Sequence, residues 1–274
     1  MRGLSGPSHV NKSTGSREGI ISHTSSMARR NRPSFYWRLV YFFVFVIAAF
    51  SLYMVFKGAV NYNRIEECKS VSDREFCGIK EIKLSLPDAL KRKVFEEVNK
   101  GTGKRVVIPG WKSGRTISTT TVRKDIPELY DWYKGLEGQI STEVGDKVLV
   151  TEDALPTTCA ILVYEEDGDF INWHYDVNYF NGRFFTLLIP CTFDDDICTE
   201  YTYYDKDSVE QGIKTKPEMS ILFEGDKVFH MATKFCKKQE KKRVVVSVQF
   251  STNPTIPWYN RAIMRVKDIA YIGY

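Results

Sequence analysis

Two histidines and one aspartate have the residue types and spacing of a metal site. Of the four histidines in the chain, only His174 and His230 lie beyond an apolar segment near the N-terminus. His174 and Asp176 are two residues apart in a run of strand-like composition, so on a strand both would project from one face. If that face points into a barrel, an imidazole from a neighbouring strand completes a set of two histidines and one carboxylate, which is typical of non-haem Fe(II) oxygenases. His230 is the only histidine left to supply that imidazole, so the candidate ligands are His174, Asp176 and His230.

An arginine follows this pattern at a place where it could bind an anion. Arg243 lies 13 residues after His230, at the head of the apolar run VVVSVQF. Burial of a lone guanidinium in such a run costs free energy unless the group meets an anion. Taken singly, these features have simpler interpretations: His174 could be a core histidine bonded to Asp176, and His230 could be a turn residue. Arg243 could equally lie at the start of a strand and reach solvent.

Short runs rich in β-branched and aromatic residues follow Pro156 and predict strands. They cover residues 157–166, 170–176, 183–191, 200–205, 219–225, 228–233 and 243–250. Before them, apolar residues at helical spacing predict helices over residues 86–99 and 126–140. About seven strands after two helices predict an α+β fold, a double-stranded β-helix (jelly roll) with flanking helices packed on its outside.

An uncharged apolar segment, residues 39–56, predicts one transmembrane helix ahead of this domain. As a helix its 18 residues would extend over roughly 27 Å, enough for the hydrocarbon core of a bilayer. A buried core helix is one alternative, but the segment has no polar face at helical spacing. A cleaved signal peptide is another, but its charged leader would be unusually long at 38 residues.

The charges on the two sides of this segment predict its orientation. Residues 1–38 carry seven Lys/Arg and one Glu, whereas residues 57–274 carry 32 Lys/Arg and 33 Asp/Glu. Because positive charge stays on the cytoplasmic side, we expect a type II signal anchor with the C-terminal domain in the lumen of the ER or Golgi. If the chain is viral, the membrane would be that of a virion. The near-neutral C-terminal part excludes a nucleic-acid footprint.

These observations divide the chain into four parts. We expect a disordered, basic cytosolic tail (1–38), a transmembrane anchor (39–56), a stalk (57–85) and a lumenal domain (86–274). All six cysteines follow the anchor, as expected of an oxidising compartment. The short separations Cys68–Cys77 and Cys191–Cys198 favour local bridges, and we predict a disulfide between Cys191 and Cys198. Spacing does not fix connectivity, and buried free thiols are the alternative.

Over roughly residues 86–250 the sequence resembles the 2-oxoglutarate/Fe(II) dioxygenases, and among them the prolyl 4-hydroxylase type. The resemblance rests on these segments: Tyr164 and Gly168 ahead of His174-Tyr-Asp176, Arg183-Phe-Phe-Thr186-Leu187, Lys216 to Phe223, and Gly114 to Ser118. It implies a jelly-roll fold and a hydroxylation that consumes 2-oxoglutarate and O₂. The implied cofactors are Fe(II), 2-oxoglutarate, O₂ and ascorbate.

The resemblance also implies a role for each matched residue. The iron ligands would be His174, Asp176 and His230, with no catalytic residue beyond them. Arg243 takes the place of the basic residue that pairs with the distal carboxylate of 2-oxoglutarate, and a guanidinium suits this task because it can bind a carboxylate through two hydrogen bonds. Tyr164 and Thr186 match positions near that co-substrate. The positions near the substrate groove are Arg115, Ser118 and Arg183.

One segment departs from the family pattern and leaves the substrate open. The Gly-Gly-Glu-Thr expected after the third strand is missing, and residues 194–201 (DDDICTEY) stand there. Because that segment shapes the substrate side, the target could be a prolyl or a lysyl side chain, and the acidic residues 194–196 could replace the missing function.

The favoured function is a membrane-anchored 2-oxoglutarate- and Fe(II)-dependent dioxygenase acting on secretory-pathway proteins. One alternative is a non-catalytic type II membrane or envelope protein that uses its jelly roll for adhesion or assembly. Another is a metal-dependent cupin that ignores 2-oxoglutarate. The expected partners are a peptide or protein substrate and the membrane, with no nucleic acid. The sequence leaves the oligomeric state open.

Overall fold

A computed structural model gives the structure of residues 35–70, 78–151, 155–192, 200–205, 207–236 and 241–258, with residues 260, 261, 264 and 268. In residues 54–70 it describes the backbone only. The chain divides into two compact units, Met1–Phe50 and Ser51–Tyr274. Residues 1–34 of the predicted tail lie outside the described part of the chain.

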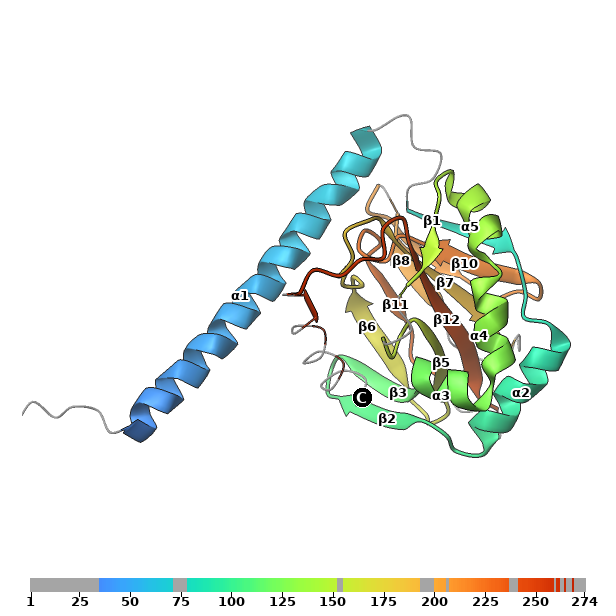
Figure 1. Cartoon of the computed structure of the whole chain (residues 1–274), viewed down its shortest axis with the longest axis horizontal. Coiled ribbons are helices and arrows are strands. Elements are labelled where there is room, and N and C mark those ends of the chain that lie inside the picture. Colours follow the sequence, from blue (N-terminus) through green and yellow to red (C-terminus); the bar gives the residue numbers. More distant parts are fainter. Residues whose placement is uncertain are drawn as a thin grey trace, which may run out of the picture. The chain divides into compact units, whose positions relative to one another are not determined.

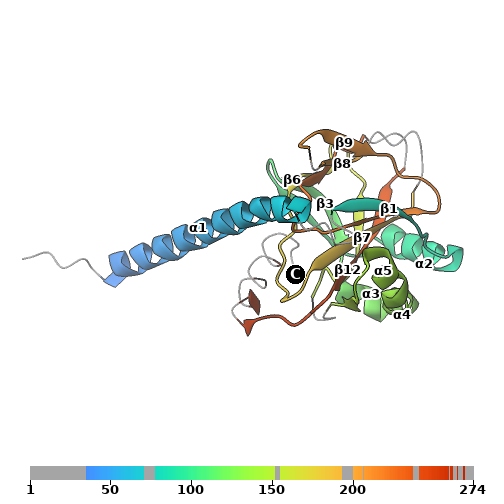
Figure 2. The same ribbon diagram turned by 90° about the horizontal axis from the view of Figure 1, so that it is seen from above.

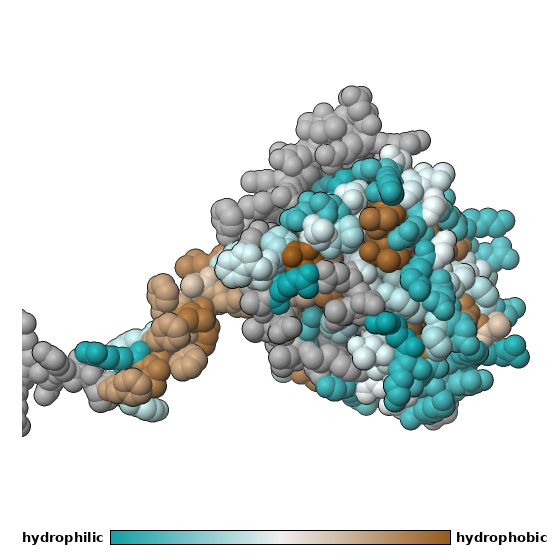
Figure 3. Space-filling view, in the orientation of Figure 1, coloured by the Kyte–Doolittle hydropathy of each residue, from teal (hydrophilic) through white to brown (hydrophobic). Residues whose placement is uncertain are grey.

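The first helix, α1 (Phe35–Ser70), contains the predicted membrane anchor. Its segment Phe35–Tyr53 is long and apolar enough to cross a membrane, with a mean hydropathy of 1.9, and none of it is buried. Figure 3 shows its apolar side chains exposed along the helix. This exposure argues against the core-helix alternative, whereas a signal sequence near an N-terminus would have the same length and composition. The helix continues to Ser70, through part of the segment predicted to be a stalk.

The second unit is built on one curled, antiparallel sheet, in which the structure describes twelve strands (Figure 1). Along the sheet their order is β1-β10-β7-β12-β5-β3-β6-β11-β8-β9, with β2 paired to β3 and β4 paired to β12. β3 pairs with both β5 and β6 and so joins the two halves of the sheet. The strands are β1 (Ile79–Lys83), β2 (Lys104–Ile108), β3 (Lys112–Ile117), β4 (Leu149–Val150), β5 (Cys159–Tyr164), β6 (Phe170–His174), β7 (Phe184–Pro190), β8 (Tyr201–Tyr204), β9 (Glu210–Ile213), β10 (Met219–Phe223), β11 (His230–Ala232) and β12 (Arg243–Ser251). A curled sheet with helices on its outside fits a jelly roll, so the predicted fold class is confirmed.

Each of the seven predicted strand segments contains one strand, and five other strands were not predicted. These five are β1, β2, β3, β4 and β9, which are short or carry many polar residues, as in KSGRTI of β3 and EQGI of β9. β1 falls inside the segment predicted to be a stalk. It pairs with β10 at one edge of the sheet, with Ile79 opposite Phe223. The sheet therefore begins before residue 86.

Four helices pack together on one side of the sheet (Figure 2). They are α2 (Asp88–Asn99), α3 (Thr119–Asp125), α4 (Pro127–Lys134) and α5 (Glu137–Val144). α2 matches the helix predicted over 86–99. The single helix predicted over 126–140 is instead two, because the helical turn tightens after α4: the N–H of Leu136 bonds to the carbonyl oxygen of Tyr133, three residues back, at 3.0 Å.

Strict alternation along the central strands separates a helix-facing core from a second, inward face. On β12, the side chains of Val244, Val246, Val248 and Phe250 belong to the core beneath the helices. Those of Arg243, Val245, Ser247 and Gln249 line a pocket on the other side of the sheet. β5 and β7 alternate in the same way. The core side of β5 carries Cys159, Ile161 and Val163, and that of β7 carries Phe185, Leu187 and Ile189. The helices therefore stabilise one face and leave the other for a binding site.

The alternation also explains why the predicted Cys191–Cys198 disulfide is wrong. Cys191 continues the core-facing series of β7 and is buried in the core as a free thiol. Burial raises the pKa of this thiol to about 12, so it behaves as a small apolar side chain. Cys159 is a second buried free thiol, whereas Cys236 is disulfide-bonded. Cys77 and Cys198 lie outside the described residues.

Candidate metal and co-substrate site

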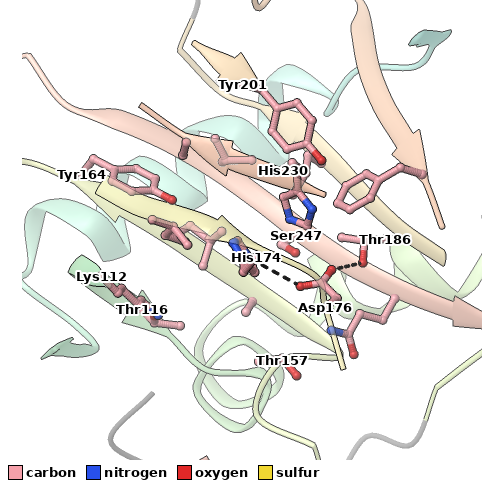
Figure 4. Close-up of a pocket in the computed structure, with 18 of the residues that line it drawn as sticks. Lys112, Thr116, Thr157, Tyr164, His174, Asp176, Thr186, Tyr201, His230 and Ser247 are labelled. Carbon is pink, nitrogen blue, oxygen red and sulfur yellow. Dashed lines mark hydrogen bonds and ion pairs between the residues drawn. The ribbon is translucent and has the colours of Figure 1, made fainter. Parts of the chain in front are cut away.

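The structure brings the three predicted metal ligands together. His174 ends β6 and His230 begins β11, and the two residues are directly opposite each other in the antiparallel pairing of these strands. Asp176 follows two residues after His174. One ligand atom from each of the three lies within 4.8 Å of the others, and Nε2 of His174 is 3.7 Å from Oδ1 of Asp176 (Figure 4). Local strand pairing and the two-residue spacing therefore assemble the set.

Backbone carbonyl groups fix the tautomer of both imidazoles. Nδ1 of His174 lies 2.7 Å from the carbonyl oxygen of Asn172, and Nδ1 of His230 lies 2.8 Å from that of Val228. A carbonyl oxygen only accepts, so each Nδ1 carries the proton and donates it, which leaves the lone pair on Nε2 of a neutral ring. Burial lowers the pKa of His230, while the charge of Asp176 opposes this shift. The hydrogen bonds thus leave Nε2 of each neutral ring as the atom that can bind a divalent metal.

The carboxylate of Asp176 is oriented by a hydroxyl group and by its own backbone. Oδ1 faces His174, and Oδ2 accepts a hydrogen bond of 2.9 Å from Oγ1 of Thr186 on β7. The backbone N–H of Asp176 donates to the carbonyl oxygen of Gly225 at 2.8 Å. Thr186, which sequence resemblance placed near the co-substrate, lines the pocket and also holds a ligand in place.

Gly225 leaves no room for a side chain beside this carboxylate. A Cβ atom added to it would lie 2.5 Å from Oδ2 of Asp176, 2.8 Å from Cβ of Asp176 and 2.9 Å from the ring of Phe184. A glycine is required here because the backbone approaches the ligand closely, not because of a positive φ angle.

We expect Gly225→Ala to weaken divalent-metal binding by at least about tenfold, because Asp176 must move away from the two imidazoles. The matched control is Gly138→Ala, since an added Cβ at Gly138 in α5 meets no atom within 4 Å. Mn(II) affinity measured by electron paramagnetic resonance checks both variants. Parent-like Mn(II) binding by the Gly225 variant would show that this contact does not position the ligand.

The three ligands face a pocket between the two halves of the sheet, with a cavity volume of about 130 Å³. Arg243, at the start of β12, lines it and is only 5% exposed. Arg243 is opposite Tyr164 in the pairing of β12 with β5, and its guanidinium carbon lies 5.1 Å from the centre of the Tyr164 ring. Burial lowers the pKa of Arg243 and raises that of Tyr164 to about 12. A buried cation and a protonated phenol in one pocket favour an anionic ligand such as a carboxylate.

Three residues that sequence resemblance placed near the substrate groove have other contacts. Arg115 is buried on the other side of β3, where it binds Glu165 through two hydrogen bonds of 2.6 and 2.8 Å. Ser118 caps α3, because its hydroxyl accepts a hydrogen bond from the backbone of Thr121. Arg183 donates to the fully buried Glu224 at 2.9 Å. None of the three lines the pocket. The contacts described hold the scaffold, and a place near the substrate groove stays a prediction.

Other residues that line the pocket were not predicted from the sequence. Lys112 and Thr116 lie on β3, a strand that its polar composition concealed. Tyr201 lies on a predicted strand, in the segment that departs from the family pattern. Ser247 could have been found, because it interrupts the apolar run VVVSVQF at an alternate position.

Comparison of the sequence with protein-family models finds no match, and none of the curated proteins matches it. Solved structures do match. The match to the non-haem α-ketoglutarate-dependent epimerase SnoN from nogalamycin biosynthesis covers 69% of this chain and 81% of the SnoN chain, at 10% identity and a TM-score of 0.51. The match to the carbocyclase SnoK from the same biosynthesis covers 64% of this chain and 79% of the SnoK chain, at 14% identity and a TM-score of 0.50. The match to a Pseudomonas putida prolyl-4-hydroxylase covers 64% of this chain and 92% of the hydroxylase chain, at 13% identity and a TM-score of 0.49.

At such low identity these similarities concern the fold alone. The two structures with a TM-score of 0.50 or above show that the second unit has the fold of 2-oxoglutarate/Fe(II) oxygenases, as the sequence resemblance implied. Because a shared fold does not establish a shared activity, the chemistry of this chain depends on which side chains it places in the pocket. Two imidazoles with free Nε2 atoms and one carboxylate suit Fe(II), and the buried Arg243 suits a carboxylate of the co-substrate.

Proposed function

We propose that the chain is a membrane-anchored 2-oxoglutarate- and Fe(II)-dependent dioxygenase that hydroxylates a prolyl or lysyl side chain of a peptide or protein. The observation that carries the proposal is the set His174, Asp176 and His230, with both Nδ1 atoms bonded to backbone carbonyl groups, in a pocket that also contains the buried Arg243. A non-catalytic adhesion domain has no need of this arrangement, and we do not favour it.

Each residue has a defined task in this proposal. His174, Asp176 and His230 would hold Fe(II), which when bound supplies the activation of O₂ coupled to oxidation of 2-oxoglutarate. Arg243 would bind a carboxylate group of 2-oxoglutarate, and Tyr164 would donate a hydrogen bond nearby, since its raised pKa keeps the phenol protonated. Thr186 keeps the carboxylate of Asp176 in the orientation needed to bind the metal. Ascorbate would serve as the reductant.

A turnover assay tests the proposal and its substrate class. We expect the full chain in detergent, with Fe(II), ascorbate and O₂, to convert 2-oxoglutarate to succinate, and to do so faster with a suitable peptide. Proline-rich and lysine-containing peptides are compared side by side, and mass spectrometry detects the gain of one oxygen atom. Metal binding without succinate formation would favour a cupin with other chemistry. Absence of both metal binding and turnover would favour the non-catalytic alternative.

The membrane topology has its own test. We propose a type II protein of the ER or Golgi membrane, because the arginine-rich residues 1–38 precede an exposed apolar helix. In sealed microsomes, added protease should remove only the N-terminal tail and leave a fragment that begins near residue 39. Detergent provides the control, since it should expose the whole chain. Complete digestion without detergent would reverse the orientation.

A further inference from the structure

Tyr201 places a hydroxyl group in the pocket that the proposed function has not used. The residue lies on β8, is 2% exposed and lines the same pocket as the metal ligands (Figure 4). Its hydroxyl oxygen is buried and has no hydrogen-bond partner among the described residues. Buried hydroxyl groups almost always have a partner, so an orphaned one in a binding pocket indicates a ligand.

Neighbouring rings fix the position of this hydroxyl. The Tyr201 ring stacks on the imidazole of His230 with a centroid distance of 5.3 Å and an interplanar angle of 22°. It also contacts the ring of Phe223, at a centroid distance of 5.5 Å. A phenol held between two rings on a strand cannot turn toward another partner without breaking these contacts, so its hydroxyl stays beside the metal ligands.

The charges around Tyr201 favour a ligand that accepts a hydrogen bond. A phenol is protonated at neutral pH, and Tyr201 shares its pocket with Asp176 and Arg243. The phenol therefore donates a hydrogen bond, in a pocket that also contains the carboxylate of Asp176 and the guanidinium of Arg243. A carboxylate oxygen is the strongest acceptor that such a pocket can receive.

We propose that the hydroxyl of Tyr201 donates a hydrogen bond to a carboxylate oxygen of the dicarboxylic co-substrate, and so sets the affinity of this chain for it. This inference rests on the proposed function and adds to it a residue that no family motif predicts. Tyr201 stands in residues 194–201, which replace the Gly-Gly-Glu-Thr of the resembling family. The chain thus supplies its own donor where the family pattern is lost.

The test compares Tyr201→Phe with Tyr203→Phe in the full chain loaded with Mn(II) under anaerobic conditions. Tyr203 is the next inward residue of β8, packs beside Tyr201 and does not line the pocket. Tyr201→Phe keeps the ring against His230 and removes only the hydroxyl. We expect its dissociation constant for 2-oxoglutarate, measured by calorimetry, to rise about tenfold. Mn(II) affinity should stay within about twofold of the parent in both variants, because no metal ligand is changed.

Thermal unfolding without co-substrate separates a binding role from a structural one. Removal of a buried hydroxyl that has no partner should leave the Tm of Tyr201→Phe equal to or above that of the parent, while the rise in Tm on adding 2-oxoglutarate should shrink. If Tyr201→Phe binds 2-oxoglutarate as tightly as the parent, or changes only the KM for peptide, the inference about Tyr201 is overturned and the proposed function is not. A parent that binds Mn(II) but not 2-oxoglutarate overturns the proposed function itself.

Discussion

Asp176→Ala is expected to lower the affinity for Fe(II) or Mn(II) by at least about 100-fold and to abolish succinate formation. The carboxylate is one of three protein ligands, and the imidazoles of His174 and His230 alone leave the ion with two. Loss of an outer partner of a metal ligand costs 10–100-fold in affinity as a rule, so loss of the ligand itself should cost at least the upper value. Thr186→Val, which removes only the 2.9 Å hydrogen bond to Oδ2, should therefore fall between Asp176→Ala and the parent.

The matched control is Asp207→Ala, because Asp207 is an exposed carboxylate on the turn between β8 and β9. Calorimetric titration with Mn(II) measures all variants, and circular dichroism shows whether each one is folded. A folded Asp176 variant that binds Mn(II) like the Asp207 variant would show that the three residues do not form the metal site. A metal affinity unchanged by Thr186→Val would show that the hydrogen bond seen here does not position Asp176.

The candidate metal site could be predicted from sequence because its geometry is local. His174 and Asp176 share one stretch of chain, and a two-residue spacing places both on the same side of a strand. His230 could be added only because so few histidines are present in the chain. The bonds that orient these groups could not be predicted in this way. The carbonyl of Val228 and the close approach of Gly225 depend on how β10 and β11 pair with their neighbours, which no spacing reveals.

The contacts that could not be predicted from sequence share one physical cause. Arg115 and Arg183 matched family segments near the substrate, but each is bonded to a glutamate far away in sequence, Glu165 or Glu224. A buried arginine needs an anion, and sequence cannot say whether that anion belongs to the protein or to a ligand. The predicted Cys191–Cys198 disulfide failed for a similar reason, because the alternation along β7 directs the Cys191 thiol into the core. In each case the side of the strand decided the contact.

For Arg243 we propose that a ligand supplies the anion. It is as buried as Arg115, but it lines the pocket, with the Tyr164 ring beside it. If its guanidinium binds a carboxylate of 2-oxoglutarate, truncation removes a charge-assisted pair from a buried site, which costs about 2–5 kcal/mol. We therefore expect Arg243→Ala to weaken 2-oxoglutarate binding at least about tenfold, with Mn(II) binding unchanged.

Arg243→Lys distinguishes a specific carboxylate contact from loss of packing. A lysine restores the charge without the planar fork of donors, so we expect it to recover part of the affinity that Arg243→Ala loses. Arg92→Ala, at an exposed position of α2, is the control and should bind 2-oxoglutarate like the parent. The measurement is calorimetry with 2-oxoglutarate on the Mn(II)-loaded full chain, with the Tm of each variant recorded in parallel. If Arg243→Ala is folded, binds Mn(II) and retains the 2-oxoglutarate affinity of the Arg92 variant, then the buried guanidinium serves the fold, and the co-substrate carboxylate must be bound elsewhere in the pocket.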